Sequence, residues 1–305
     1  MVKIFLGIKD IMQRLLRNRI LFIIKIFITT IILFIIFRKI DFTKVFQNYY
    51  RIDLLTIFII IVTALLKMYL QYINWGKYLQ LNPDYKPRKI EILRTLFIGD
   101  ALRFLIPGGY GVFGKMFFIN NEKKASFLSI GIEKFLQIWT SLLFASFAAI
   151  FYFQNLKLII KIFVFCLILI SPFIINLFSH LIKREKIKIF INEYIKIIPN
   201  IVFRQIAFMF LTLIQYFVLI LCFKNIIFFH IIISVPLILS ANIIPLTYAG
   251  LGLRETFAVE ILSKYNISGE IAVFCSLMIF LINTFLPALV GVYFILRSRH
   301  IRKSS

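Results

Sequence analysis

Residues 242–252 read Asn-Ile-Ile-Pro-Leu-Thr-Tyr-Ala-Gly-Leu-Gly, and Arg254 follows two positions later. An earlier stretch, residues 104–111, reads Phe-Leu-Ile-Pro-Gly-Gly-Tyr-Gly and is followed by Lys115. Proline interrupts helical hydrogen bonding and glycine permits tight turns, so each stretch predicts a break between two helical segments. The expected turn residues are Pro107, Gly108, Gly109, Gly111, Pro245, Gly250 and Gly252.

The composition of the chain around these breaks is that of a membrane protein. Of its 305 residues, 61% are hydrophobic and 16% are charged, and 36 are Phe. A soluble domain is nearer half apolar, with about a quarter of its residues charged. The apolar residues gather in runs of roughly 17 to 29, long enough to cross a hydrocarbon core of about 30 Å as helices. The sequence therefore predicts an all-α polytopic membrane protein and excludes a soluble one.

Six apolar runs are expected to be transmembrane helices. They lie at 20–37, 52–75, 125–151, 156–178, 201–223 and 268–296. The run at 20–37 follows a basic segment and has no small-residue cleavage site, so it is interpreted as an uncleaved span. The two interrupted stretches, 90–122 and 226–262, are interpreted as re-entrant helical hairpins that enter and leave on one side.

The distribution of basic residues sets the expected orientation. The chain carries a net charge of +23. With two re-entrant hairpins, one set of loops and both termini carry 18 of the 36 Lys and Arg, and the opposite loops carry 7. Cytoplasmic loops are the basic ones, so both termini are predicted to be cytoplasmic, in the plasma membrane. The excess charge indicates contact with anionic lipid headgroups rather than with nucleic acid.

An internal repeat follows from this topology. The order span, span, hairpin, span occurs in residues 20–151 and again in 156–296, within a single transmembrane domain 1–305. Three spans per copy is an odd number, so the second copy would be inverted in the membrane. Inverted repeats with paired Pro/Gly-broken segments indicate the central site of a transporter. Two unrelated helix breaks are the alternative.

The first break is a candidate anion site. Backbone amides freed by Pro107 near a helix N-terminus favour anions, and Lys115 adds a full positive charge. A lipid phosphate is therefore a natural ligand, and a glycine turn that only allows close helix packing is the alternative. Gly109–Lys115 also fits GxxxxGK, but Met116 stands where a P-loop needs Ser or Thr, so nucleotide binding is not expected.

Charged residues within the apolar stretches complete the candidate site. Such residues should face the protein interior and pair with one another. Asp100 could pair with Arg103, while Glu133 or Glu255 could pair with Lys115, Arg103 or Arg254, in a binding role or a purely structural one. Lys134 adjoins Glu133 and is included among the charge partners. Long side chains near span ends are expected to reach the headgroups; these are Lys25, Lys67, Lys161 and Arg204.

These residues resemble a known family, the membrane domain of lysylphosphatidylglycerol synthases and its stand-alone, flippase-like relatives. The resemblance rests on the Pro-Gly-Gly-x-Gly turn at Pro107–Gly111 with Lys115 after it, on the pair Glu133-Lys134, and on the Pro-Leu-Thr-x-x-Gly-x-Gly-x-x-Glu run from Pro245 to Glu255. It covers about residues 90–296. Lys115 stands where many relatives carry arginine, which keeps the charge but loses a bidentate grip on phosphate.

The resemblance implies a lipid translocator. In the larger synthases this domain resembles a flippase unit for aminoacylated phosphatidylglycerol, and stand-alone relatives are linked to lipid-phosphate or lipid-linked sugar carriers. We therefore expect translocation of a phosphate-bearing lipid held by Lys115, Arg103 and Arg254, with no enzymatic activity, cofactor or metal. The alternative is a non-catalytic membrane partner or scaffold for a separate glycosyltransferase or lipid synthase.

Overall fold

The computed structural model describes residues 43, 48–105, 107–174, 185–244 and 250–303. Within these ranges the chain is helical apart from turns and contains no strand, as predicted. The expected first span at 20–37 and the turn residue Pro245 lie outside the described residues.

Four described helical segments are long and apolar enough to cross a membrane. They are α4 (Leu54–Leu79), α6 (Lys123–Tyr152), α9 (Glu185–Leu221), and a last run made of α12 (Gly269–Phe280), the π-helical η7 (Leu281–Phe285) and α13 (Leu286–Lys303). A short 3-10 turn, η1 (Asn48–Arg51), precedes α4, and the side chain of Asp53 then caps that helix by accepting a hydrogen bond from Thr56 N at 3.3 Å. These segments match four of the expected spans.

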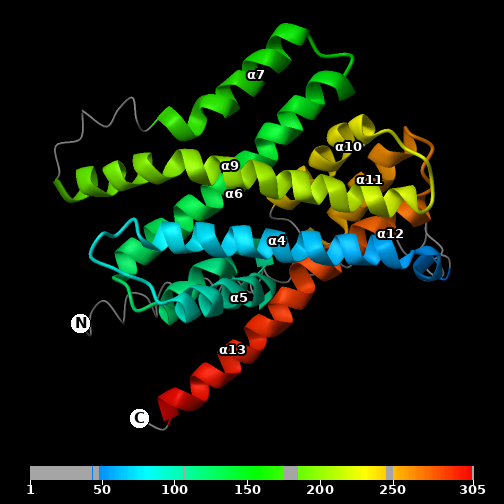
Figure 1. Ribbon diagram of the computed structural model, residues 1–305. Helices are drawn as coiled ribbons and strands as arrows, with labels where there is room; N and C mark the ends of the chain where they lie inside the picture. Colours follow the sequence, from blue (N-terminus) through cyan, green and yellow to red (C-terminus); the bar gives the residue numbers. More distant parts are fainter. Residues whose placement is uncertain (1–42, 44–47, 106, 175–184, 245–249, 304–305) are drawn as a thin grey trace, which may run out of the picture.

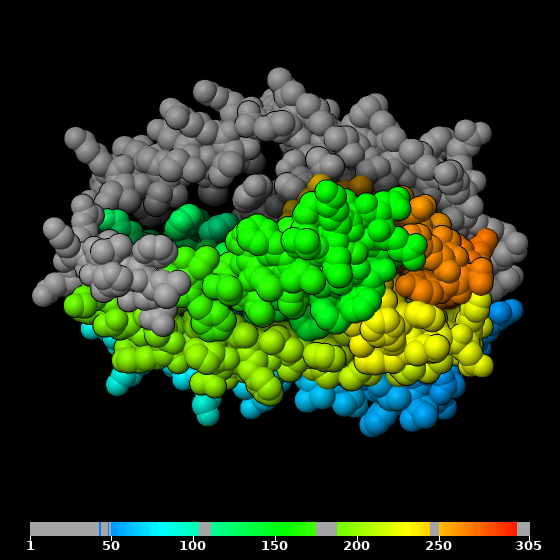
Figure 2. All heavy atoms as spheres, turned by 90° about the horizontal axis from the view of Figure 1, so that it is seen from above, coloured from blue at the N-terminus to red at the C-terminus, as the bar shows by residue number. Residues whose placement is uncertain are grey.

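The span expected at 156–178 is shorter where it is described. It consists of α7 (Leu158–Ile170) and the 3-10 turn η3 (Ser171–Phe173). No residue of α7 is buried, and Ile159 is 82% exposed. The helix lies on the outer face of the molecule, in green in Figure 2. An exposed helix that is apolar apart from Lys161 fits contact with lipid chains, so the chain is an integral membrane protein.

The first interrupted stretch forms a hairpin of two helical arms. Its arms are α5 (Lys89–Leu105) and the 3-10 helix η2 (Pro107–Phe118). The arms lie against each other, because a Cβ at Gly99 would be 3.0 Å from Lys115 Cδ. At the base, Asn120 N donates to Glu91 Oε1 at 2.9 Å, so the beginning and the end of the hairpin lie next to each other. The second arm is not α-helical, and its glycines have low helix propensity.

The second interrupted stretch is a hairpin with the same plan. Its arms are α10 (Phe228–Ser240), continued by the 3-10 turn η5 (Ala241–Ile243), and α11 (Leu253–Ser263). Lys224 Nζ donates to the carbonyl of Asn266 at 2.7 Å and closes the base. Gly250 and Gly252 have φ values of 79° and 87°, a left-handed region that glycine adopts without strain.

Contacts between helices join the N-terminal and C-terminal parts of the chain. The hairpin helix α5 packs on α13, and the hairpin helix α10 packs on α6, so each hairpin lies against the last helix of the other half. The two long helices α4 and α9 run side by side (Figure 1). The second arms also correspond, because η2 packs on α6 and α11 packs on α12. Each half of the sequence therefore completes the packing of the other.

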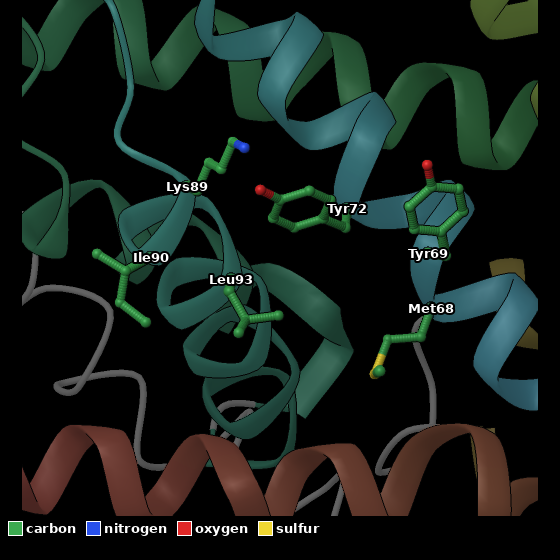
Figure 3. Close-up of a pocket in the computed structure, with 6 residues that line it drawn as sticks. All are labelled: Met68, Tyr69, Tyr72, Lys89, Ile90 and Leu93. Atoms are coloured by element: carbon green, nitrogen blue, oxygen red, sulfur yellow. The ribbon is translucent and has the colours of Figure 1, made fainter.

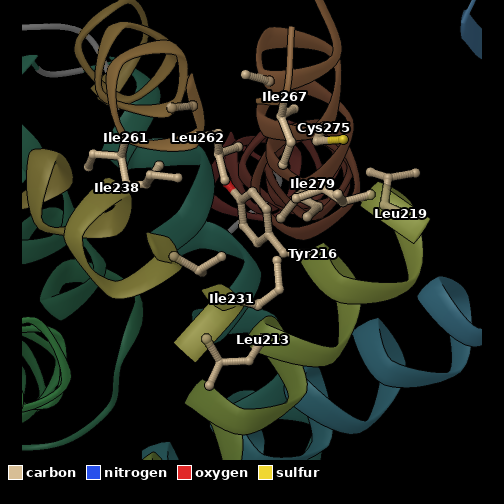
Figure 4. Packing of buried hydrophobic residues seen from close by; sticks show 14 of the residues in the cluster. Leu213, Tyr216, Leu219, Ile231, Ile238, Ile261, Leu262, Ile267, Cys275 and Ile279 are labelled. Atoms are coloured by element: carbon tan, nitrogen blue, oxygen red, sulfur yellow. The ribbon is translucent and has the colours of Figure 1, made fainter. Parts of the chain in front are cut away.

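Two buried clusters hold the helices together. One gathers around Tyr216 of α9, between α10, α11 and α12 (Figure 4), and the other lies between α4, α5, η2, α6 and the start of α9. The α5–α13 contact depends on a glycine. A Cβ at Gly291 would lie 1.9 Å from the carbonyl oxygen of Phe97, so only glycine lets the two backbones approach this closely.

The prediction that Lys67 reaches the headgroups is wrong. Lys67 lies in the middle of α4, is 4% exposed, and donates a hydrogen bond to Gln215 Oε1 on the neighbouring α9. Arg204 is half-buried and donates to Asn74 Oδ1, and Lys161 donates to carbonyls at the end of α6. Because α4 extends to Leu79, Lys67 is far from either end, and an acceptor on α9 takes the place of water. Lys25 is outside the described residues.

Candidate functional site

The first hairpin is anchored by a buried ion pair. Lys115 of η2 is 1% exposed, and its Nζ lies 2.5 Å from Glu133 Oε2 on α6. The same Nζ lies 3.3 Å from the centre of the Trp75 ring on α4. Trp75 Nε1 in turn donates to Thr95 Oγ1 on α5 at 2.8 Å. The ammonium of Lys115 is therefore neutralised by a carboxylate of α6 and covered by an aromatic face of α4, which α5 holds in place.

The second hairpin is anchored by a buried hydrogen-bonded network. Arg254 Nη2 lies 2.5 Å from Glu255 Oε1, and Arg254 Nε donates to Ser276 Oγ on α12 at 2.8 Å. Ser276 Oγ donates to Glu255 Oε1 at 2.9 Å, and Gly252 N donates to Glu255 Oε2 at 2.7 Å. Glu255 thus caps the start of α11 while balancing the charge of Arg254. Both charged groups are satisfied within the protein.

Three further charged residues belong to the helices beside the first anchor. Asp100 and Arg103 are on α5 and Lys134 is on α6, and all three are half-buried. None of them forms an ion pair within 4.0 Å with another described residue. Lys134 Nζ donates instead to the neutral Gln137 Oε1 at 2.8 Å. Their charges nevertheless act on one another, and Arg103 also acts on Arg254, so Arg103 connects the two hairpins electrostatically.

The charges of this central cluster do not cancel. The cluster consists of Asp100, Arg103, Lys115, Glu133, Lys134, Arg254 and Glu255. Four of these side chains are basic and three are acidic. The two basic groups that have no ion pair with a described residue, Arg103 and Lys134, repel each other. Uncompensated charge is costly where water is excluded, so the arrangement favours an added anion.

Comparison with known protein families identifies the family of the chain. The model of the lysylphosphatidylglycerol synthase TM region matches residues 22–291. The chain belongs to this family. The match covers most of the chain, as the resemblance of its motifs implied, and includes both hairpins and the central cluster. No curated protein and no solved structure matches it.

In this member of the lysylphosphatidylglycerol synthase TM family, the expected turn residues that the structure describes lie at the start of the second arm of each hairpin. Pro107, Gly108 and Gly109 begin the 3-10 arm η2, and Gly111 within it is buried. Gly250 and Gly252 supply the left-handed turn before α11. A Cβ at Gly250 would lie 2.2 Å from Asn242 Oδ1, so this glycine also allows the two arms of the hairpin to meet.

Several residues that contact the cluster were not expected from the sequence. Trp75 covers Lys115, although the two are far apart in the sequence and no spacing relates them. Ser276 is a buried polar residue within the apolar helix α12, which is a usable signal because such residues need a partner. Gly99 faces Lys115 from α5 and leaves room for its side chain.

A groove of about 430 Å³ lies outside the cluster, between α4 and the start of α5. It is lined by Met68, Tyr69, Tyr72, Lys89, Ile90 and Leu93 (Figure 3). The groove is mostly apolar, with Lys89 at its rim, and it shares no residue with the charged cluster.

Proposed function

We propose that the protein translocates a phosphate-bearing lipid, such as an aminoacyl-phospholipid or a polyprenyl-phosphate carrier, across the plasma membrane. Membership of the family and the membrane-helical architecture fit a lipid-related transport role. The observation that carries the proposal is the positive excess of the central cluster, in which two basic side chains, Arg103 and Lys134, have no ion-pair partner among the described residues. A lipid phosphate supplies the missing negative charge.

Within this proposal the basic residues divide into two roles. Lys115 and Arg254 are each neutralised by a carboxylate, so they hold the hairpins in place rather than bind the phosphate directly. Arg103 and Lys134 have no such partner among the described residues and are left to bind it. A guanidinium can donate two parallel hydrogen bonds to one phosphate, which favours Arg103 as the main ligand.

Movement of the lipid would follow from the two-fold plan of the helices. The corresponding contacts of the two halves support an inverted repeat, with the second half reversed relative to the first. In such a protein one repeat rocks against the other and exposes a central site to each leaflet in turn. Both termini would be cytoplasmic, as the basic loops favour.

The proposal is tested in vesicles that contain the purified protein and a labelled phospholipid. Arg103→Gln and Lys134→Gln should each slow translocation by roughly tenfold to a hundredfold, because a charge-assisted hydrogen bond contributes about 1.5 to 3 kcal/mol. Lys124→Gln is the control, since Lys124 is an exposed lysine on the same helix as Lys134. Wild-type rates in both site variants would overturn the site, and no translocation by the wild type would favour the scaffold role.

A further inference from the structure

A buried lysine lies outside the cluster that the proposed function uses. Lys67 is in the middle of α4, about 20 Å along the helix from Leu54, and its side chain is far too short to reach either end. Its Nζ donates to Gln215 Oε1 at 3.1 Å and lies 4.6 Å from the centre of the Phe208 ring. Both partners belong to α9, so Lys67 lies in the contact between the two long corresponding helices.

Amide side chains extend this contact to the last helix. Asn283 Nδ2 donates to Gln215 Oε1 at 2.8 Å, and Gln215 Nε2 lies 3.3 Å from both Asn283 Oδ1 and the carbonyl of Ile60. Asn283 belongs to the π-helical segment η7 and also donates to the carbonyl of Ile279 at 3.1 Å. Pro287 follows four positions later and has no N–H for the carbonyl of Asn283, which explains the irregular helix.

Lys67 has no counter-charge among the described residues. Among the described residues no carboxylate lies within 4.0 Å of it, and its partners Gln215 and Phe208 on α9 and Asn283 on η7 are uncharged. The elements α5 and α6 also pack on α4, but none of their carboxylates, Glu91, Asp100 and Glu133, forms an ion pair with Lys67. Arg204 on α9 is bound to Asn74.

An unbalanced ammonium in such surroundings is unstable, and a lysine there releases its proton instead. A neutral amine still donates to Gln215 Oε1 and needs no counterion. The tight packing of Lys67 against α9 also leaves it almost without contact with solvent or ligand, which favours a site for a proton over a site for an anion.

We propose that Lys67 is a proton-binding site that couples lipid movement to protons. The amine is neutral in the arrangement described here, and its nitrogen lone pair takes a proton from water when α4 moves against α9 and opens the contact. The same proton returns to water when the contact closes. The coupling rests on the proposed transport function, whereas the protonation state of Lys67 does not.

The protonation state is tested by unfolding in mixed micelles from about pH 6 to about pH 10, since an unfolded lysine titrates near pH 10.4. The native state then binds one proton fewer than the unfolded state, so the stability of the wild type rises with pH. Lys67→Met lacks this dependence. The ratio of the unfolding equilibrium constant of Lys67→Met to that of the wild type should therefore rise with pH, by up to about tenfold per pH unit.

Lys77→Met is the matched control, because Lys77 is an exposed lysine of the same helix that also donates to a glutamine, Gln80. Lys67→Gln repeats the test with a polar replacement if the Met variant folds poorly. The proposal is overturned if the Lys67 variants differ from wild type by a constant amount at every pH. It is also overturned if the difference follows chloride concentration instead, which would indicate an anion site.

A second measurement examines the coupling itself. Translocation by the wild type should depend on pH, and Lys67→Gln should remove that dependence while Lys77→Met keeps it. The coupling would be contradicted if translocation by Lys67→Gln depended on pH as strongly as translocation by the wild type. Because the unfolding experiment needs no lipid movement, a failure of the proposed transport function and a failure of the proton site give different results.

Discussion

The Nζ atom of Lys115 and the Oε2 atom of Glu133 lie 2.5 Å apart, and both side chains are buried. One belongs to the 3-10 arm of the first hairpin and the other to α6, so the pair ties a short, glycine-rich segment to a long apolar helix. A buried ion pair contributes little net stability as a whole, but each member needs the other. This asymmetry gives the pair a specific experimental signature.

Replacing one member of this pair should be much worse than replacing both. Lys115→Met leaves the Glu133 carboxylate buried without its partner and should lower the free energy of unfolding by about 3 to 5 kcal/mol. Adding Glu133→Gln removes the unpaired charge and should restore most of that loss. Unfolding of the single and double variants in mixed micelles measures both effects. Equal stability of Lys115→Met and the wild type would show that Lys115 and Glu133 do not form a buried ion pair.

The network at the second hairpin predicts a smaller effect. Ser276→Ala removes one of the two acceptors of Arg254 Nε and one of the donors to Glu255 Oε1, while the direct hydrogen bonds from Arg254 to Glu255 remain. We expect a loss of about 1 to 3 kcal/mol, the cost of buried polar groups that lose a partner. Ser263→Ala is the control, since Ser263 is exposed and bonds only to its own helix. A stability change no larger than that of the control would refute this account of the network.

Two glycines predict opposite results for the same substitution. Gly291→Ala places a methyl group against the carbonyl of Phe97 and should destabilise the protein by separating α5 from α13. Gly131→Ala meets no atom within 4 Å in the interior of α6, and it should stabilise the protein by about 0.5 to 1 kcal/mol. Thermal unfolding of the two variants compares them directly. The close packing of α5 on α13 would be disproved by a tolerated Gly291→Ala.

Much of the fold was predictable because its signals are local. Long apolar runs predicted the four long helices, and proline with glycine predicted both hairpins. The 3-10 form of η2 was not predictable, since it depends on packing of its glycine-rich arm against α5. The first expected span and Pro245 lie outside the described residues, so the predictions made for them stay predictions.

The site was less predictable because charge alone does not choose a partner. The sequence identified Lys115 and Arg254 as phosphate ligands, yet each has a carboxylate in contact, and Arg103 and Lys134 are left without one among the described residues. The burial of Lys67 depends on Gln215, which is 148 residues away in the sequence. Such pairings arise only when distant helices pack.

The central claim is that Arg103 and Lys134 bind a lipid phosphate. Its most direct test is mass spectrometry of the lipids that co-purify with the protein in mild detergent, compared with the bulk membrane extract. The account predicts enrichment of one phosphate-bearing lipid with the wild type and with Lys124→Gln, and loss of that enrichment with Arg103→Gln and with Lys134→Gln. A wild-type lipid profile that matches the bulk membrane, or an enrichment unchanged in both site variants, would contradict it.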